Sequence, residues 1–214
     1  MKNFFFPKNE KICYIVGSYE FGEIHIEKGE GDVIISADGG LLLLEKNGIL
    51  PDVIMGDFDS LGYIPKGENI SVFPKEKDDS DSCIAVKYGF ENGYNNFIIY
   101  GGVGGRIDHT FGNIQLLSMI SERGGRGVLI GGKTALTVIK NSQLEIKGKG
   151  FVSVFSLSDK CEGVTLKNLK YTLENAELTN TFPLGLSNEF VNEEDFALIR
   201  VQNGTLLVVI NEIT

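Results

Sequence analysis

The stretch DVIISADGGLLLLEKNGILPDVIMGDFDS, residues 32–60, indicates the fold of the first half of the chain. DVIISADGG (32–40) predicts a buried strand that ends in Asp-Gly-Gly, and LLLLEKNG (41–48) predicts a short helix that ends at a glycine. DVIMGDFDS (52–60) repeats the pattern of the first strand. Strand, helix and strand, with strands rich in Val and Ile, are typical of a parallel sheet covered by helices.

The same alternation continues on both sides of this stretch. Further strands are predicted at 11–18, 70–74, 96–102 and 126–132, and further helices at 80–93 and 106–125. Ser80 or Asp81 can serve as N-cap of the first of these helices. In the second, apolar residues recur at spacings of four, three and three from Ile107 to Leu117, which predicts an amphipathic helix. Because parallel sheets bind ligands at the carboxyl ends of their strands, a site is expected there.

The character of the sequence changes after residue 132. Short alternating segments rich in β-branched residues follow, separated by turn residues, at 134–140, 143–148, 150–158, 162–173, 196–202 and 205–210. They predict an all-β sandwich or open barrel of roughly 80 residues. The expected fold class is therefore an N-terminal α/β domain with a parallel sheet, residues 1–132, followed by a C-terminal all-β sandwich, residues 133–214.

The composition excludes several classes of protein. The 214 residues carry a net charge of −9 and lack the Lys/Arg stripe of a duplex-binding protein, so no nucleic-acid partner is expected. The three cysteines show neither metal spacing nor a disulfide framework, which is typical of thiols in a reducing cytosol. No stretch is suited to span a membrane or to act as a signal peptide. We expect a cytoplasmic protein without a membrane partner.

Seven of the eleven aspartates lie in four short motifs. The motifs are SADGG (Asp38), GDFDS (Asp57, Asp59), KDDSD (Asp78, Asp79, Asp81) and GGVGGRIDH (Asp108). Brought to one edge of a sheet, these carboxylates would repel one another by about 1 kcal/mol per close exposed pair in water. Mg²⁺ relieves such repulsion and shares its remaining coordination sites with substrate phosphates. The motifs together therefore predict a Mg²⁺ ion that carries the phosphates of a nucleotide.

Each motif taken alone has a simpler explanation. SADGG suits a turn, GDFDS a helix cap or Asx turn, and KDDSD a solvated loop that caps a helix. GGVGGRIDH is harder to explain in this way, because four glycines between a strand and a helix leave backbone amides near a helix N-terminus, where anions bind. Arg106 adds a planar donor group suited to phosphate. Lys77 suits either a phosphate contact or the surface, and His109 either a base or a structural role.

The four motifs, in this order and with Asn113 after the last, resemble those of the thiamine pyrophosphokinase family. In the second half, GVTLKNLKYTL (163–173) and LSNEF (186–190) are similar to C-terminal signatures of that family, so the resemblance covers nearly the whole chain. It implies an α/β domain that binds ATP and Mg²⁺, a β-sandwich that binds thiamine, and a homodimer with sites between subunits. The implied reaction moves a pyrophosphoryl group from ATP to the thiamine hydroxyl, giving thiamine diphosphate and AMP.

The resemblance also implies roles for particular residues. The catalytic group would be Asp57, Asp59, Asp78, Asp81, Arg106 and Asp108. ATP would be bound by Asp38, Gly39, Gly40, Lys77, Gly102, Gly104, Gly105, Arg106, Asp108 and Asn113. The metal would be held by Asp57, Asp59 and Asp81, and thiamine would lie near Tyr171, Ser187 and Asn188. Asp81 or Asp57 is our hypothesis for the proton acceptor, because crowded carboxylates raise one another's pKa.

The sequence departs from the family pattern in two places and has no tryptophan. Ser80 stands where the family usually has threonine, which keeps a hydroxyl. Asn168 stands where glycine is usual, which puts the turn before Leu169 in question. Without tryptophan, aromatic packing on thiamine falls to Tyr or Phe, with Tyr171 as the candidate.

Three other functions remain open on the sequence. A Mg²⁺-dependent phosphohydrolase is one, since aspartyl-nucleophile phosphatases also begin with an apolar strand that ends in Asp-x-Asp. The second is a pyrophosphokinase that acts on another alcohol, such as a pterin. The third is a nucleotide- or thiamine-binding module without catalysis. A further alternative for the β half is that it only dimerises.

Overall fold

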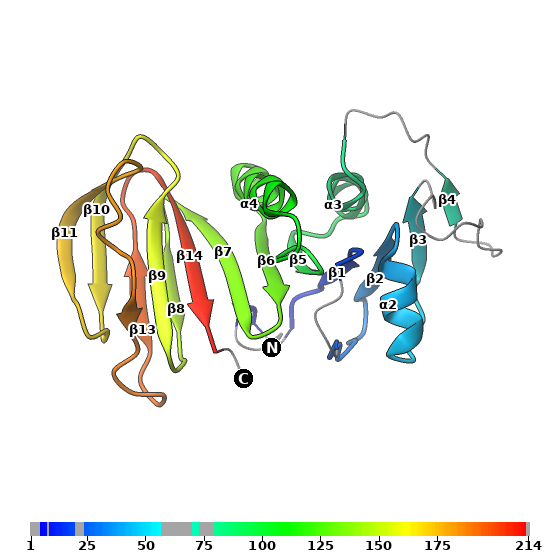
Figure 1. The fold of residues 1–214 in the computed structure, drawn as a ribbon, viewed down its shortest axis with the longest axis horizontal. Coiled ribbons are helices and arrows are strands. Elements are labelled where there is room, and N and C mark those ends of the chain that lie inside the picture. Colours follow the sequence, from blue (N-terminus) through cyan, green and yellow to red (C-terminus); the bar gives the residue numbers. More distant parts are fainter. Residues whose placement is uncertain (1–4, 8, 20–23, 57–69, 73–78, 213–214) are drawn as a thin grey trace. The chain divides into compact units, whose positions relative to one another are not determined.

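The computed structural model describes residues 5–7, 9–19, 24–56, 70–72 and 79–212. The chain forms two compact units (Figure 1). The α/β unit consists of the described parts of Asn9–Leu116 and Leu129–Gly132, and the β unit of those of Met1–Lys8, Leu117–Val128 and Lys133–Thr214. Among the described helices, none has the length and apolar character needed to cross a lipid bilayer.

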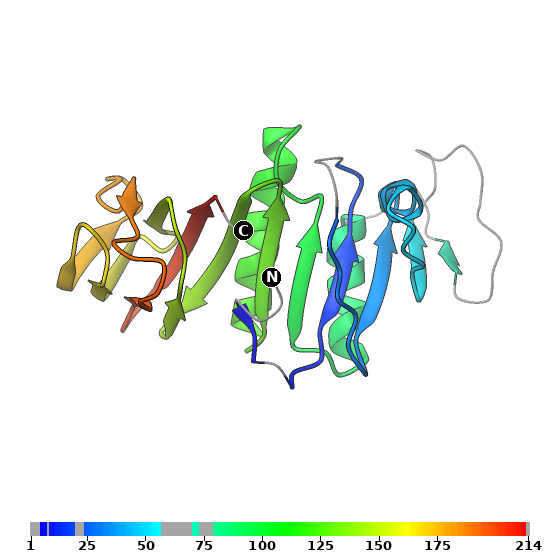
Figure 2. The ribbon, with the colours of Figure 1, turned by 90° about the horizontal axis from the view of Figure 1, so that it is seen from below.

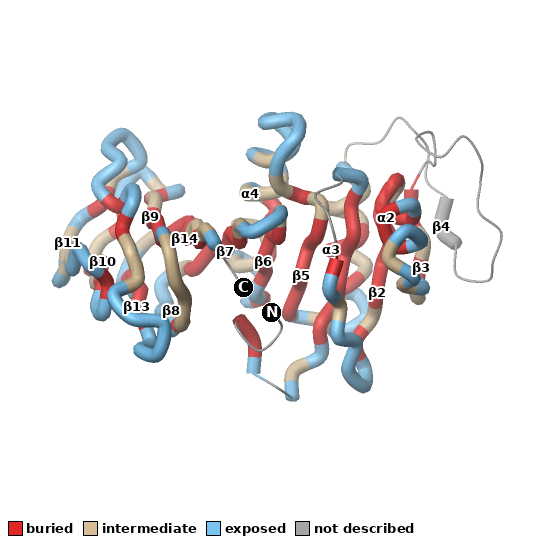
Figure 3. Tube along the Cα trace, turned by 60° about the horizontal axis from the view of Figure 1, so that its bottom comes forward, coloured by how far each residue is buried: buried red, intermediate tan, exposed pale blue. Residues whose placement is uncertain are grey.

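The α/β unit is built on a parallel sheet. Its strands are β1 (Cys13–Val16), β2 (Val33–Ala37), β3 (Val53–Gly56), β4 (Ile70–Val72) and β5 (Asn96–Tyr100), and they pair in the order β5-β1-β2-β3-β4. The central strands β1, β2 and β5 are buried along almost their whole length (Figure 3). This burial on both faces explains why these strands are continuous runs of apolar residues.

Two helices cover opposite faces of this sheet, α2 (Gly40–Lys46) on one side and α3 (Asp81–Glu91) on the other (Figure 2). Helix α3 begins where predicted, because the Ser80 hydroxyl accepts a hydrogen bond from the Cys83 backbone N–H at 3.2 Å. It packs closely on the sheet at Gly89, where an added Cβ would lie 2.6 Å from the Phe97 ring. A third helix, α4 (Ile107–Glu122), follows β5. The first turns of α3 and α4 therefore both lie at the carboxyl edge of the sheet.

Two buried tyrosines fix the segment that leads into β2. The Tyr14 hydroxyl donates to the Glu27 carbonyl at 3.3 Å, and the Tyr100 hydroxyl to the His25 carbonyl at 2.9 Å. Burial raises the pKa of Tyr100 to about 12, so its hydroxyl remains a donor at neutral pH.

The described strands of the β unit pair antiparallel in two groups. One has the order β12-β9-β14-β7 and consists of β7 (Thr134–Lys140), β9 (Phe151–Ser156), β12 (Asn188–Glu189) and β14 (Thr205–Asn211). The other has the order β11-β10-β13-β8 and consists of β8 (Gln143–Ile146), β10 (Lys160–Lys167), β11 (Leu173–Thr179) and β13 (Ala197–Arg200). The remaining strand, β6 (Arg126–Gly131), contributes residues to both units.

The predicted fold class is confirmed, with two differences in detail. The segment 162–173 is not one strand, because β10 ends at Lys167 and β11, in which only Leu178 is fully buried, begins at Leu173. The prediction for α4 also fails in its first turns, where the apolar side chains of Ile107 and Phe111 are 75% and 66% exposed instead of buried. The face that α4 buries is formed by Leu116, Leu117 and Ile120.

Candidate active site

A cavity of about 550 Å³ lies within the α/β unit, where the carboxyl ends of β1, β2 and β5 meet the starts of α3 and α4. This volume is typical of a pocket for a small organic ligand. Seven of the residues predicted from the sequence line it: Asp38, Asp81, Gly102, Gly104, Arg106, Asp108 and Asn113. Segments that are far apart in the sequence thus meet at one site, as expected for a parallel sheet.

Asp38 is held in an unusual backbone conformation at the end of β2. Its φ is +48°, and its N–H donates to the Met55 carbonyl at 2.6 Å. Gly56 on β3 permits this close approach, because an added Cβ there would lie 2.8 Å from the Asp38 Cα atom. The Ser18 hydroxyl donates to the Asp38 carboxylate at 3.4 Å. The backbone of Asp38 is therefore fixed by β3, and its carboxylate, which lines the cavity, is held by Ser18.

Of the two glycines next to Asp38, Gly40 allows close packing. Gly39 is the N-cap of α2, and Gly40 is its first residue. A Cβ on Gly40 would lie 1.8 Å from the Val16 carbonyl oxygen, so only glycine lets α2 start this close to β1. Neither glycine is among the residues that line the cavity.

Two side chains of α4 fix the glycine-rich loop 101–105. The Thr110 hydroxyl accepts a hydrogen bond from the Gly104 N–H at 3.1 Å, and the Asn113 amide donates to the Gly102 carbonyl at 2.8 Å. The Gly104 amide is therefore engaged within the loop, which differs from the expectation that the glycine amides are left for an anion. Gly104 and Gly105 both have positive φ, +99° and +62°.

Arg106 and Asp108 form an ion pair at the rim of the cavity. The Arg106 Nη2 and Nε atoms donate to the two Asp108 carboxylate oxygens at 2.5 and 3.2 Å. Asp108 also accepts from the His109 N–H at 3.0 Å. The hydrogen bond from Arg106 lowers the pKa of Asp108 below its ordinary value and raises the pKa of Arg106. Both groups thus remain charged, and Asp108 is a weak base.

The KDDSD motif divides its aspartates between two tasks. Asp79 accepts from the Lys87 ammonium at 2.6 Å and from the Cys83 thiol at 3.3 Å, and the Lys87 bond lowers its pKa. Asp79 therefore ties the start of α3 to its second turn. Asp81, the first residue of α3, lines the cavity.

Four predicted site residues, Asp57, Asp59, Lys77 and Asp78, lie outside the described residues. Among the described residues, no three His, Cys, Asp or Glu side chains are placed to hold a metal ion. Besides Asp108, which pairs with Arg106, two aspartates predicted from the sequence line the cavity, Asp38 and Asp81. Carboxylate oxygens are the ligands that Mg²⁺ prefers, so the donor chemistry fits this metal.

Two of the residues predicted in the β unit, Tyr171 and Asn188, are joined by hydrogen bonds. The buried Asn188 side chain accepts from the Tyr171 N–H at 2.9 Å and donates to the Tyr171 carbonyl at 2.6 Å. Its amide therefore fixes the Tyr171 backbone, while the Tyr171 side chain is 60% exposed. Ser187 has a φ of +59°, and its N–H donates to the Ser153 hydroxyl at 3.0 Å.

The turn at Asn168 is kept without glycine. Asn168 has a φ of +56°, the left-handed conformation that asparagine tolerates better than most residues. Its side-chain amide donates to the Phe196 carbonyl at 2.8 Å. Asparagine thus adopts the conformation for which glycine is usually needed and adds a hydrogen bond.

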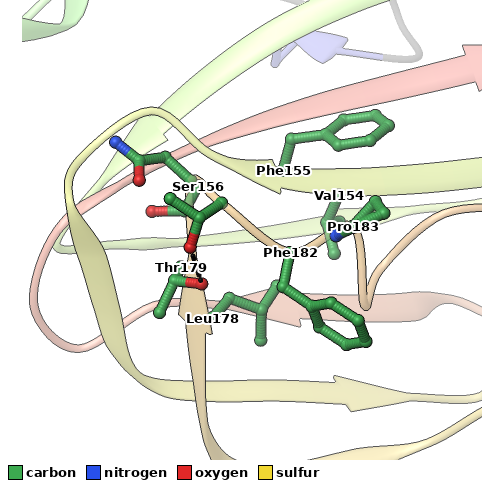
Figure 4. Close-up of a pocket in the computed structure, with 9 residues that line it drawn as sticks. Val154, Phe155, Ser156, Leu178, Thr179, Phe182 and Pro183 are labelled. Atoms are coloured by element: carbon green, nitrogen blue, oxygen red, sulfur yellow. Dashed lines mark hydrogen bonds between the residues drawn. The ribbon is translucent and has the colours of Figure 1, made fainter.

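A second, smaller cavity of about 140 Å³ lies in the β unit (Figure 4). Phe182, Pro183 and Val154 line it on one side and Thr179 on the other. None of the residues predicted to bind a ligand in the β unit lines this cavity.

Sequence reasoning missed several residues that line the larger cavity, Tyr19 among them, and also Thr110, which is not among the lining residues. Tyr19 lines the cavity, and Thr110 fixes the glycine-rich loop. Neither belongs to an acidic motif. The signal that could have found Tyr19 is its position three residues after the end of β1, since Asp38, directly after β2, lies at the same carboxyl edge of the sheet.

Comparison with known families gives two matches along the chain. A family model described as "Thiamin pyrophosphokinase, catalytic domain" matches residues 28–126. A second, described as "Thiamin pyrophosphokinase, vitamin B1 binding domain", matches residues 137–206.

Similar proteins and solved structures agree with these matches. The protein from Bacillus subtilis (strain 168) called thiamine pyrophosphokinase is 29% identical over 167 residues, which cover 74% of this chain and 78% of that protein. A crystal structure of thiamin pyrophosphokinase from Geobacillus thermodenitrificans superposes with a TM-score of 0.81 at 26% identity, covering 95% of this chain and 98% of the other. The crystal structure of the Bacillus subtilis enzyme gives a TM-score of 0.82 at 24% identity, with 96% and 100% covered, and shows the shared fold.

Proposed function

Since the chain belongs to the thiamin pyrophosphokinase family, we infer that it is a diphosphotransferase that makes thiamine diphosphate and AMP from ATP and thiamine. The observation that carries this conclusion is the match of both family domains, in order, to consecutive parts of the chain. In the reaction, the thiamine hydroxyl oxygen forms a bond to the β-phosphorus of ATP. The bond from this phosphorus to the oxygen bridging the α- and β-phosphates breaks, and AMP leaves.

We propose that ATP binds in the cavity of the α/β unit. Arg106 has five N–H donors and gives two of them to Asp108, which leaves three for phosphate oxygens. Asn113 and Thr110 hold the glycine-rich loop in place for this contact. Gly39, Gly40 and Lys77 remain part of the proposal as ATP-binding residues predicted from the sequence.

The proposed metal is Mg²⁺, held by Asp81 together with Asp57 and Asp59. The carboxylate donors fit this ion, and Asp38 lines the same cavity. When bound, Mg²⁺ would neutralise charge on the triphosphate and align its oxygens.

The proton of the thiamine hydroxyl needs an acceptor in the chain. Asp108 is poorly suited, because Arg106 lowers its pKa and so reduces its basicity. We propose Asp81 or Asp57 for this role, with Asp78 nearby in sequence as a further catalytic carboxylate. Proton transfer would come late, as is usual for a loose phosphoryl-transfer transition state.

We propose that the α/β domain, residues 1–132, carries ATP and that the β domain, residues 133–214, carries thiamine and dimer contacts. Tyr171 offers an exposed aromatic ring for thiamine, and Ser187 lies next to the Asn188 side chain that holds the Tyr171 backbone. A location in the cytoplasm belongs to the same proposal, since none of the three cysteines, all described, forms a disulfide.

A homodimer is the proposed assembly. Large apolar side chains are exposed in both units, among them Ile107 and Phe111 on α4 and Phe182 and Val191 in the β unit. Exposed apolar side chains that gather into a patch are typical of surfaces that a partner covers. Analytical ultracentrifugation should give twice the mass of one chain, and a monomer at micromolar concentration would contradict this part.

Product analysis tests the proposed function. The purified protein with Mg²⁺ and ATP should release AMP only when thiamine is added, and thiamine diphosphate should appear in equal amount. ADP, or free phosphate formed without thiamine, would overturn the proposal in favour of a kinase or phosphohydrolase. Transfer to a pterin instead of thiamine would show that the enzyme acts on another alcohol.

Asn188→Ala should raise the KM for thiamine about tenfold and leave the KM for ATP within twofold. The substitution removes both hydrogen bonds to the Tyr171 backbone and should also destabilise the protein by about 1–3 kcal/mol. Steady-state kinetics with each substrate varied in turn, together with thermal melting, measure both effects.

Asn192→Ala provides the matched control. Asn192 lies in the same unit, is exposed, and bonds only to its neighbours Glu194 and Asp195 among the hydrogen bonds of the described residues. It should change neither KM and shift stability by no more than about 0.5 kcal/mol. If the thiamine KM is unchanged in Asn188→Ala, Tyr171 and Asn188 do not belong to the thiamine site. The β domain would then serve only for dimer contacts.

A further inference from the structure

Tyr19 follows β1 at the carboxyl edge of the sheet. The Gly17 N–H donates to the Tyr100 carbonyl at 2.9 Å. This bond extends the pairing of β1 with β5 by one residue and fixes the backbone two residues before Tyr19. The Ser18 hydroxyl points to the Asp38 carboxylate. The backbone before Tyr19 is therefore anchored to both neighbouring strands of the site.

The Tyr19 ring lies directly against the glycine-rich loop. A Cβ added to Gly104 would lie 2.6 Å from the Tyr19 Cε1 atom, and one added to Gly105 would lie 2.5 Å from its Cε2 atom. Atoms at both edges of the ring thus lie close to glycine backbone, and a Cβ at Gly104 or Gly105 would force the ring to move. The glycine-rich loop and the ring are in close contact, so the loop limits the positions that the ring can take.

The rest of the Tyr19 side chain is open to the cavity. Tyr19 is 41% exposed, although it is aromatic and packed on backbone. It lines the same cavity as Asp38, Asp81 and Arg106. The site therefore contains one supported aromatic surface beside groups suited to bind a charged triphosphate.

We propose that Tyr19 stacks on the nucleobase of ATP and so sets the affinity of the site for the nucleotide. This inference rests on the proposed function, because it takes ATP as the ligand of this cavity. Aromatic rings stack on nucleobases irrespective of the base's hydrogen-bonding pattern. Tyr19 is then a binding residue for ATP that lies outside the acidic motifs.

The chemistry of the ring favours the base over the other parts of the substrates. The face of an aromatic ring carries partial negative charge, so it does not attract phosphate oxygens. The thiazolium ring of thiamine is a cation and could also lie on tyrosine. We assign the ring to the base because Arg106 and the carboxylates that would bind the triphosphate and its metal lie in the same cavity.

Tyr19→Leu and Tyr19→Phe test the proposal in the full-length enzyme. Leucine keeps apolar bulk but removes the ring, and should raise both the KM and the Kd for Mg-ATP about tenfold, with kcat and the thiamine KM changed less than threefold. Phenylalanine keeps the ring and should restore the ATP KM to within threefold of the original. Inorganic tripolyphosphate with Mg²⁺ has no base, so its inhibition constant should be the same in Tyr19→Leu and the unmodified protein.

Tyr94→Leu is the matched control. Tyr94 lies in the same unit, outside the cavity lining, and its hydroxyl donates to the Gly31 carbonyl. It should leave the ATP KM unchanged, and thermal melting of all variants reports whether they fold.

Four results would overturn the stacking role. An ATP KM within twofold of the original in Tyr19→Leu is the first. An equal loss of tripolyphosphate binding would mean that the ring only supports the loop, and a raised thiamine KM with constant ATP KM would place the ring on thiazolium. A loss in Tyr19→Phe as large as in Tyr19→Leu would point to the hydroxyl. Calorimetric binding of Mg-ATP separates this inference from the proposed function, since a protein that binds ATP through Tyr19 but forms no AMP would contradict only the latter.

Discussion

Asp81→Asn is expected to lower kcat at least a hundredfold while the protein stays folded. Asp81 lines the cavity of the α/β unit as the first residue of α3, and it is the one described residue among our three metal candidates. Asparagine keeps the shape and one oxygen but loses the charge that a metal ligand or a base requires. A hundredfold loss corresponds to about 2.7 kcal/mol of lost transition-state stabilisation. Steady-state kinetics at saturating ATP and thiamine measure it.

The stability of Asp81→Asn should change little. A carboxylate in the first turn of a helix stabilises it by about 0.3–1 kcal/mol, so thermal melting should show a shift of a few degrees at most. Asp79→Asn is the control two residues away. Asp79 is tied to Lys87 and Cys83, so its loss should affect melting slightly and kcat less than threefold. If kcat falls equally in both variants, or in neither, Asp81 has no special role in the chemistry.

Gly40→Ala is expected to destabilise the protein by about 3 kcal/mol, at the upper end of the cost of overpacking. The new Cβ would lie 1.8 Å from the Val16 carbonyl oxygen, and neither atom can rotate away, because the oxygen belongs to the backbone and the position of a Cβ is fixed by it. For a chain of this length such a loss lowers the melting temperature by roughly 6–12 °C. Because Gly40 follows Asp38 so closely, ATP binding should weaken as well.

Gly112→Ala gives the opposite expectation at another helical glycine. Gly112 lies inside α4, and an added Cβ there would meet nothing within 4 Å. Alanine should therefore stabilise the helix by about 0.5–1 kcal/mol. Denaturant titration of both variants compares them, and a Gly40→Ala protein as stable as Gly112→Ala would show that α2 can move away from β1.

The parallel sheet was predictable because burial on both faces forces its strands to be apolar throughout. The runs at β1, β2 and β5 leave no alternation that could be mistaken for another structure. Strand β11 gave no such signal, because Leu178 is the one buried residue among its seven. The face of α4 was misjudged for a related reason, since apolar periodicity does not distinguish a core from another surface that a partner covers.

The charged residues of the candidate site were predictable from the sequence, but the residues that contact its glycine-rich loop were not. Asp38, Asp81, Arg106 and Asp108 stand out because carboxylates and glycines cluster at strand ends, where a parallel sheet binds ligands. The role of Thr110 depends on a helical turn that places its hydroxyl under the Gly104 amide, and that of Tyr19 on loop geometry. Residue identity alone does not reveal either contact. Asn168 shows the converse, because its departure from glycine is accommodated by a left-handed conformation that asparagine tolerates and by the hydrogen bond to Phe196.

The most direct test of the account follows both transferred phosphorus atoms. With ATP labelled separately at the β- and γ-phosphorus, thiamine diphosphate should carry both labels in equal amount, and AMP should carry neither. This result requires attack at the β-phosphorus and transfer of the pyrophosphoryl group as one unit. Thiamine diphosphate that carries only the γ label, or label found only in free phosphate, would contradict the central claim that this chain is a thiamine pyrophosphokinase.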